Sequence, residues 1–347
     1  MTTPLNQRKQ AHLRTVISHR DADRRKFYFR QLRLMPRALP EMNLADVDPR
    51  CSFLGKTLSF PLLISSMTGG VGAELETVNR NLALAAEATG IALAVGSQRV
   101  MLADPAARPS FALRRYAPTI PLCGNLGAVQ LNKGLGRAEA RAALEVLEGD
   151  GLYLHLNALQ EVVQPGGDTE FGGLAARIGA LVQELDRPVL VKEVGSGLSV
   201  ADAELLLAQG VRHLDVAGAG GTSWSRIEHE CAPAADPHEI GRLFQDWGLP
   251  TPLALERLAP CRDRATLIAS GGLRSGLDLA KALVLGASLG GIARPLLEPA
   301  LQSAEAVVAQ IERLKHEFTV ALFLLGARTP AEIIGREELI LGWDAGP

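Results

Sequence analysis

The chain has 347 residues, of which 47% are hydrophobic and 21% charged, and its formal net charge is −2. This composition supports a large buried core and excludes a wholly disordered chain. The near-neutral charge gives no sign of a nucleic-acid-binding protein, so an anionic ligand would have to bind in a local cationic pocket. No run of about 18 apolar residues predicts a membrane span.

The cysteines and the N-terminus indicate the cellular compartment. Cys51, Cys123, Cys231 and Cys261 show neither a CxxC pair nor the spacing of a zinc site. The first residues are polar and basic and lack the apolar stretch of a signal peptide. We therefore expect a cytoplasmic protein, with neither a membrane nor a nucleic acid as a partner.

From residue 61 onward, short apolar runs alternate with longer helical patterns. The runs that we expect to be strands are 61–67, 91–96, 121–126, 151–157, 188–194, 213–219, 265–271 and 287–293. The helices that we expect between them are 74–89, 104–116, 137–147, 174–185, 200–209, 252–258, 277–285 and 304–325. Strands that alternate with helices form parallel βαβ units, and eight of them close a barrel.

The fold class that follows is α/β, a (β/α)8 TIM barrel with an N-terminal extension. Strands buried on both faces should be continuously apolar, as these runs are. A doubly wound open sheet is the alternative, but the glycine fingerprint that it would carry after the first strand is absent. We assign residues 61–347 to the catalytic barrel and residues 1–60 to an extension or arm, which we expect to cap the barrel's N-terminal face.

Polar, charged or glycine-rich residues follow every strand-like run. Active sites of barrels lie at the C-terminal ends of the strands, so we predict the site there. The candidate residues at these ends are Ser66, Met67, Thr68, Ser97, Arg99, Asn125, His155, Asn157, Gln160, Glu161, Lys192, Thr222, Gly271, Gly272, Arg274, Ala293 and Arg294.

The ends of the last two strands have the features of a phosphate site. Gly271 and Gly272 precede a helix, and glycine lets backbone amides approach an anion closely. Barrels often bind phosphate with the loops after strands seven and eight, where Ala293 and Arg294 follow the eighth run. Tight packing at these turns is the structural alternative.

Lys192 lies inside an apolar strand, where a lysine is costly unless it is paired or faces a ligand. The N1–C2=O edge of a flavin would suit it, and a Schiff-base nucleophile of an aldolase is the rival interpretation. Glu193 should point to the opposite face of the strand. We expect it to form a salt bridge behind the barrel.

The sharpest cluster follows the fourth strand. His155 and Asn157 share one face of the strand, and Gln160 and Glu161 lie in the following loop. A carboxylate such as Glu161 suits Mg²⁺, although a lone glutamate is more often a solvated loop residue. Near the N-terminus, Arg8-Lys9 form a small basic group with His12, which matters only if the arm folds over the mouth of its own or a neighbouring barrel.

A set of motifs resembles one known family. RKxxH, SSMTGG, GSQR, GNLG, HLNALQE, QPGGD, VKEVG, DVAGAGGTSW, ASGG and IARP occur in this order along nearly the whole chain. Together they resemble type 2 isopentenyl diphosphate isomerases, and HLNALQE and AGAGGTSW are the most specific of them. The family interconverts isopentenyl and dimethylallyl diphosphate by a 1,3-allylic proton shift. Reduced FMN is its acid–base cofactor, without net redox change, and NADPH serves only to reduce the flavin.

The resemblance also implies roles for residues. It assigns FMN to Ser66, Met67, Thr68, Ser97, Asn125, Lys192 and Thr222, with Gly271, Gly272, Arg274, Ala293 and Arg294 around the phosphate. It assigns the substrate to Arg8, Lys9, Arg99, His155, Asn157 and Gln160, with His155 and Gln160 in catalysis and Mg²⁺ on Glu161. It further implies a homotetramer or homooctamer in which the arm covers a neighbouring active site.

Two other functions remain open on the sequence alone. An FMN oxidoreductase of the hydroxy-acid or nucleotide-dehydrogenase type would need a catalytic His or Cys near the loop after strand six, where His229 and Cys231 lie. A non-catalytic flavin-binding protein is the other alternative, against which the intact Gln160 and Glu161 argue.

Overall fold

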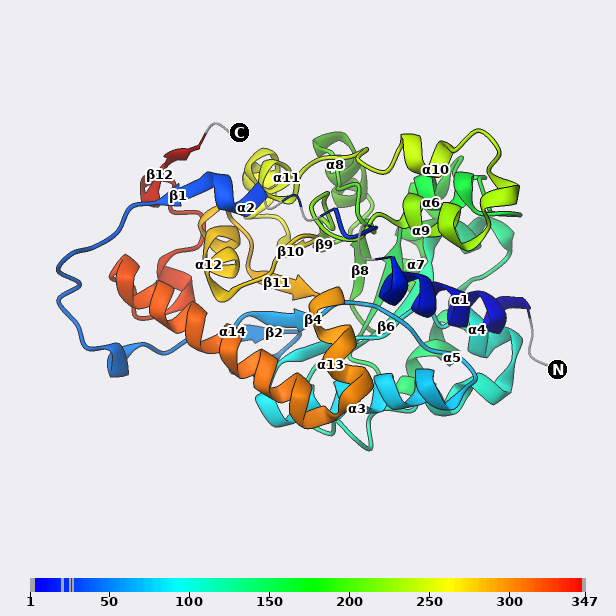
Figure 1. Ribbon diagram of the computed structural model, residues 1–347, viewed down its shortest axis with the longest axis horizontal. Coiled ribbons are helices and arrows are strands. Elements are labelled where there is room, and N and C mark those ends of the chain that lie inside the picture. The colour runs from blue at the N-terminus through cyan, green and yellow to red at the C-terminus, as the bar shows by residue number, and fades with distance from the viewer. Residues whose placement is uncertain (1–3, 20–21, 25, 27, 345–347) are drawn as a thin grey trace.

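The computed structural model describes residues 4–19, 22–24, 26 and 28–344, and its centre is a closed barrel of eight parallel strands (Figure 1). Neighbouring strands follow chain order, and the barrel closes where Gly290 pairs with Leu62. The strands are β4 (Leu62–Ile64), β5 (Ala92–Ala94), β6 (Leu122–Gly127), β7 (Gly151–His155), β8 (Val189–Lys192), β9 (His213–Asp215), β10 (Thr266–Ser270) and β11 (Leu289–Ile292). Each expected run overlaps one of them, which confirms the predicted (β/α)8 barrel.

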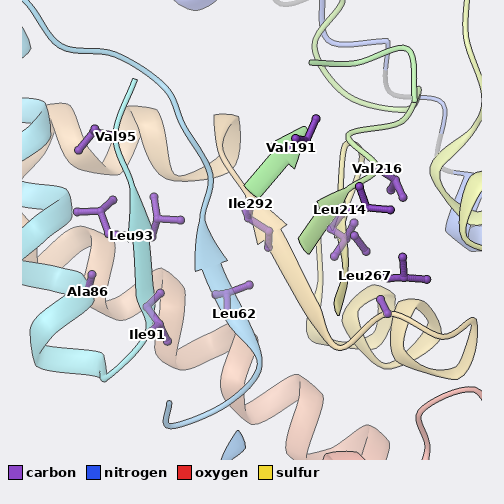
Figure 2. Packing of buried hydrophobic residues seen from close by; sticks show 14 of the residues in the cluster. Leu62, Ala86, Ile91, Leu93, Val95, Val191, Leu214, Val216, Leu267 and Ile292 are labelled. Carbon is purple, nitrogen blue, oxygen red and sulfur yellow. The ribbon is translucent and has the colours of Figure 1, made fainter. Parts of the chain in front are cut away.

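Side chains on these strands alternate between the barrel's interior and its outer surface. Leu63 of β4 packs inside the barrel with Ile268, whereas Leu62 packs outside with the helices. Figure 2 shows part of the outer layer, including Leu93 of β5 and Ala86 of a neighbouring helix. Because both surfaces of each strand are covered, the strands read as unbroken apolar runs in the sequence.

Helices surround the barrel and fill most of the expected positions. The longer ones are α3 (Ala73–Thr89), α5 (Arg137–Leu147), α7 (Leu174–Glu184), α8 (Val200–Ala208), α11 (Thr251–Leu258), α12 (Gly276–Val284) and α14 (Ala304–Leu325). The shorter α2 (Tyr28–Gln31) and α13 (Leu297–Gln302) pack beside them. In the described part of the chain, no helix combines the length and the hydropathy needed to cross a membrane.

The helix expected over residues 104–116 is wrong. The structure instead has the short helix α4 (Arg99–Ala103) and a 3₁₀ segment, Pro105–Ser110. Pro105 begins that segment and Pro109 lies inside it. Proline lacks an amide hydrogen and clashes with the preceding turn, so an α-helix cannot run through this stretch.

The N-terminal extension covers both ends of the barrel. The hairpin of β2 (Cys51–Phe53) and β3 (Lys56–Leu58) places Phe53 and Leu58 in the interior cluster, so it caps the N-terminal face as expected. Helix α1 (Pro4–Ser18) lies instead at the opposite end, while β1 (Leu32–Leu34) pairs with β12 (Ile340–Trp343). The boundary at residue 60 stays a prediction.

The long segment after β9 is folded rather than loose. It contains α9 (Trp224–Cys231) and α10 (Ile240–Leu243), and α9 packs against α6 (Ala158–Val163) and α1. Asp236 holds the segment together, because its carboxylate accepts hydrogen bonds from the Ile240 and Gly241 amides, each at 2.8 Å, and lies 2.9 Å from His229 Nδ1.

Candidate active site

The carboxyl ends of the barrel strands surround a cavity of about 260 Å³. Every residue that the sequence assigned to the isomerase site lines this cavity, from Arg8 and Lys9 on α1 to Ala293 and Arg294 after β11. The position of the site therefore agrees with the expectation, although position alone does not assign a role to any of these residues.

A polar layer forms the floor of the cavity, above the apolar interior of the barrel. Its members point inward from neighbouring strands; Ser65, Asn125, His155, Lys192 and Ser270 line the cavity, and Asp215 lies beside them without lining it. Ser65, Asp215 and Ser270 were not recognised as candidates in the sequence. Ser65 and Ser270 could have been found, because each lies two residues beyond an inward-facing apolar residue, Leu63 or Ile268.

His155 is held as a neutral ring. Its Nδ1 lies 2.7 Å from Asn125 Oδ1, and the Asn125 amide nitrogen donates to the carbonyl of Val95. This leaves the Asn125 oxygen as acceptor, so His155 Nδ1 carries the proton. Burial, followed by the charge of Lys192, lowers the pKa of His155 to about 3. The ring therefore offers hydrogen bonds, and no positive charge, at neutral pH.

Lys192 is buried at the end of β8, and its Nζ donates to the carbonyl of Glu193 at 2.7 Å. The expected salt bridge of Glu193 behind the barrel is wrong. Its carboxylate instead accepts from successive backbone amides of the following loop, those of Val194 and Gly195 at 2.6 Å, of Ser196, and of Gly197 at 3.1 Å. Glu193 thereby fixes the loop after β8, beside the lysine.

The turn after β10 requires glycine. Gly271 and Gly272 have φ angles of +91° and +88°. A Cβ on Gly271 would lie 2.1 Å from the carbonyl oxygen of Gly218, and one on Gly272 would lie 3.0 Å from backbone carbon of Gly220. The turn is thus packed against the loop after β9. This close packing requires glycine at both positions, whether or not a phosphate also binds there. Helix α12 begins just beyond them.

Two cationic side chains of the predicted phosphate region contact the N-terminal segment. Arg274 forms an ion pair of 2.5 Å with Asp23. Arg294 donates to the carbonyls of Val16 at 2.8 Å and His19 at 3.3 Å, near the end of α1. Both guanidinium groups therefore join the cavity to the arm.

Helix α1 is docked on the barrel of its own chain, whereas the family resemblance implies a neighbour's. Asn6 is fully buried, and its amide accepts from Val71 N at 2.9 Å and donates to Asp104 at 3.0 Å. Arg8 donates to the carbonyl of Pro165 at 3.2 Å. This docking brings Lys9 into the cavity wall, where burial lowers its pKa to about 8 against the opposing charge of Glu228.

Glu228 is a buried acid behind Gln160 that we did not identify from the sequence. Gln160 Nε2 donates to Glu228 Oε1 at 2.6 Å, and His12 Nε2 from α1 lies 3.0 Å from the same oxygen. Glu228 follows Trp224 by four residues on α9, and Trp224 lines the cavity. That helical spacing is the signal that could have revealed it.

Glu161 is buried at the cavity wall with both carboxylate oxygens oriented. Oε1 accepts from Asn157 Nδ2 at 2.8 Å, and Oε2 accepts from the amide of Asp168 at 2.6 Å. Among the described residues no group of three or more His, Cys, Asp or Glu side chains could hold a metal. A cation on Glu161 would thus take its other ligands from substrate and water, as Mg²⁺ commonly does.

Arg99 has a partner in the structure. Its Nη1 lies 3.1 Å from Asp168 Oδ2, which also accepts from Gln130 Nε2 at 2.8 Å. Gln130 lines the cavity and was likewise missed in the sequence, because it follows β6 without a motif of its own.

Comparison with known proteins identifies the family. The pattern of a family described as FMN-dependent dehydrogenase matches residues 159–340. An isopentenyl-diphosphate delta-isomerase of Paracoccus zeaxanthinifaciens is 54% identical over 337 residues, which is 96% of each chain. One from Hydrogenovibrio crunogenus is 49% identical over 339 residues, covering 98% of this chain and 99% of the relative. This chain belongs to the type 2, FMN-dependent isopentenyl-diphosphate delta-isomerase family. It is therefore an enzyme, as the sequence motifs predict.

Solved structures of more distant flavoproteins share the barrel. A flavocytochrome b2 variant with bound sulfite has a TM-score of 0.66 at 19% identity, covering 93% of this chain and 78% of the other. A mandelate oxidase variant with an FMN adduct has a TM-score of 0.61 at 18% identity, covering 93% and 90%. At such identities the likeness shows the fold alone.

The residues at the barrel mouth fit the flavin on which the isomerase family depends. The buried hydroxyls of Ser65 and Ser66 line the cavity and have no hydrogen-bond partner among the described residues. Lys192 supplies an ammonium at the floor, and Arg274 and Arg294 supply positive charge on the side of the glycine turn. Buried hydroxyls without partners are costly unless a ligand completes them.

Proposed function

We propose that this enzyme converts isopentenyl diphosphate to dimethylallyl diphosphate by a 1,3-allylic proton shift. One proton adds to the terminal methylene and another leaves C2, so nothing is gained or lost overall. The observation that carries the proposal is one cavity that combines Gln160 and Glu161 with the cations Arg8, Lys9 and Arg99. The cations at the rim of the cavity suit the diphosphate of this substrate.

The barrel mouth would hold FMN. The residues assigned to the cofactor are Ser66, Met67, Thr68, Ser97, Asn125, Lys192 and Thr222, with Gly271, Gly272, Arg274, Ala293 and Arg294 near its phosphate. When bound in the reduced state, FMN would supply the acid–base group and an electron-rich ring. The protein's part is to exclude water and to hold these groups in place, since an alkene is a poor base that requires a dry, well-placed acid.

His155 and Gln160 would orient the reacting groups. His155 remains neutral because its pKa is lowered to about 3, so it can hydrogen-bond the substrate but cannot donate a proton as a cation. Gln160 is held between Glu228 and Asn157, at 2.6 and 3.3 Å. An amide is a poor base, so we assign Gln160 an orienting role, together with Asn157, rather than the role of primary proton carrier.

The diphosphate would bind on the side of the cavity away from the glycine turn after β10, between α1 and α4. Arg8, Lys9 and Arg99 offset its charge. Mg²⁺ would bind Glu161 and the diphosphate oxygens, since Mg²⁺ prefers one or two carboxylates with phosphate and water. Arg99 would exchange its contact with Asp168 for the substrate.

The family resemblance supports three further parts of the proposal. NADPH would serve as the reductant of the flavin, the enzyme would be a homotetramer or homooctamer, and it would be cytoplasmic. The four cysteines, which are free thiols in the structure, agree with a reducing compartment.

The rival oxidoreductase reaction has little support in the site. His229 is buried and lies against Asp236, and Cys231 lies 3.2 Å from Thr15 Oγ1. Neither side chain lines the cavity. The loop after β9 therefore brings no histidine or cysteine to the position that hydride abstraction from a hydroxy acid would need.

An anaerobic assay in D₂O tests the proposal. The protein with FMN, Mg²⁺ and NADPH is given isopentenyl diphosphate, and the product is followed by NMR. We expect deuterated dimethylallyl diphosphate to form only while the flavin is reduced, without stoichiometric use of NADPH. Absence of isomerisation, or bleaching of the flavin by hydroxy acids, would reject the isomerase in favour of an oxidoreductase.

A further inference from the structure

Asp215 is a fully buried acid for which the proposed reaction has no role. It is the last residue of β9, and its exposed fraction is 0%. Its register partners are Lys192 on β8 and Ile268 on β10. Register partners on parallel strands point to the same side, and Ile268 belongs to the barrel's interior. Asp215 therefore points inward, beside the cavity floor.

Only one oxygen of this carboxylate is satisfied by hydrogen bonds. Oδ1 accepts from the Ser270 hydroxyl at 2.6 Å and from the amide of Ala217 at 3.2 Å. Oδ2 has no hydrogen bond of good geometry among the described residues, and the group that approaches it is the buried hydroxyl of Tyr153 on β7, which interacts with the carboxylate without forming a well-aligned bond. A buried carboxylate in this state is costly unless a cation offsets its charge.

Lys192 is that cation. Burial raises the pKa of Asp215, and the ammonium of Lys192 is the largest influence that opposes the rise. His155, the partner of Lys192 on its other side, is neutral. Asp215 is thus the one acid in the polar layer that faces the lysine, while Glu193, whose charge also interacts with Lys192, is held by the backbone amides of its own loop. Lys192 itself lines the cavity, and its ammonium, which has three donors, makes one hydrogen bond within the described part of the chain, to Glu193 O.

We propose that Asp215 acts through Lys192: from the neighbouring strand, and without a direct ion pair, its carboxylate offsets the charge of the ammonium beneath the bound flavin. The proposal rests on the FMN site proposed above. A lone cation beside a reduced flavin stabilises the anion and makes it a weaker base. A lysine balanced by a carboxylate leaves the reduced flavin basic enough to exchange a proton, which an isomerisation requires and a simple hydride transfer does not.

The flavin reduction potential of the holoenzyme tests this assignment. In D215N the lysine loses the acid that faces it in the polar layer and should favour reduced over oxidised FMN about tenfold, a rise of about 30 mV for a two-electron couple. K192M should lower the potential, because Lys192 lines the cavity and Asp215 does not. Adding D215N to K192M should change it little, since Asp215 then has no lysine through which to act.

The matched control is D150N. Asp150 is also a partly buried acid with cationic partners, Lys56 at 2.9 Å and Arg114 at 2.8 Å, but it precedes β7 at the far end of the barrel. D150N should leave the potential unchanged. An unchanged potential in D215N, or an equal shift with and without Lys192, would overturn the proposal.

Unfolding of the apoproteins in urea gives a test that does not depend on FMN. If Asp215 and Lys192 balance each other, each single substitution leaves one buried charge unpaired, and the K192M/D215N double variant should unfold at a higher urea concentration than either single variant. A double variant no more stable than the singles would overturn the coupling. This result is separate from the isomerase assay, so failure of the proposed reaction and failure of this inference can be told apart.

Discussion

At the scale of single residues, the orientation of Gln160 depends on an acid outside the cavity lining. Glu228 accepts from the Gln160 amide nitrogen at 2.6 Å, while Asn157 donates to the amide oxygen at 3.3 Å. Glu228 is 2% exposed and also contacts His12 of α1. One carboxylate thus connects the arm to the residue that we expect to orient the substrate.

Replacing Glu228 tests this connection. A hydrogen bond to a charged group contributes about 1.5–3 kcal/mol, so E228A should lower kcat roughly 10- to 100-fold with a smaller change in KM. E228Q, which can still accept the bond, should recover part of the loss. E230Q is the control, because Glu230 lies on the same helix and pairs with Arg226 instead. Equal losses in E228A and E230Q would point to disruption of α9 rather than to orientation of Gln160.

The pH dependence of substrate binding should report Lys9. Burial lowers its pKa from the ordinary value to about 8, so it loses its charge as the pH rises through 8 rather than near 10.5. The kcat/KM of the free enzyme should therefore fall above pH 8, because diphosphate binding loses one cation. K9R, whose guanidinium stays charged, should remove this alkaline limb. A limb that persists in K9R would assign the titration to another group.

At the scale of elements, the turn between β10 and α12 is fixed by backbone contact. G271A places a Cβ 2.1 Å from the Gly218 oxygen at φ +91°, so it should destabilise the protein by well over 1 kcal/mol and weaken FMN binding. G286A is the matched control, since Gly286 has φ +102° but its Cβ would meet nothing closer than 3.9 Å. Urea unfolding and FMN titration of both variants separate crowding from backbone strain; equal behaviour would show that crowding is unimportant.

The elements that could be predicted from the sequence are those with a local physical cause. Buried parallel strands must be apolar on both faces, so all eight runs were visible, and the active site follows from where strands end. The failed helix at 104–116 shows the limit, because a helix is expected between two strands but Pro105 and Pro109 interrupt this one. The role of Asp236 could not be predicted for another reason. Its hydrogen-bond partners lie in the same irregular segment, and no periodic pattern in the sequence predicts the path of that segment.

At the scale of the whole molecule, the arm could not be placed from the sequence. Helix α1 is polar and reads as a solvated terminus, and only tertiary contacts such as the buried Asn6 show that it closes the barrel mouth. The hydrogen-bond partners of Glu193 and Glu228 could not be predicted either, because they are the backbone amides of a loop or side chains of distant elements. Local pattern predicts which residues line the site, but the contacts that orient them depend on the assembled fold.

Removal of residues 1–18 tests what the arm contributes. The barrel, its floor and the β2–β3 hairpin do not include these residues, so the truncated protein should fold and retain FMN. It should lose kcat/KM by at least about 100-fold, because Arg8 and Lys9 no longer meet the diphosphate and each charge-assisted contact contributes about 1.5–3 kcal/mol. Full-length R14A is the control, since Arg14 is an exposed cation on the same helix. A truncated enzyme with normal kcat/KM would show that the site is complete without the arm. A similar loss of kcat/KM in R14A would show that the overall positive charge of the helix, not the docked position of Arg8 and Lys9, attracts the substrate.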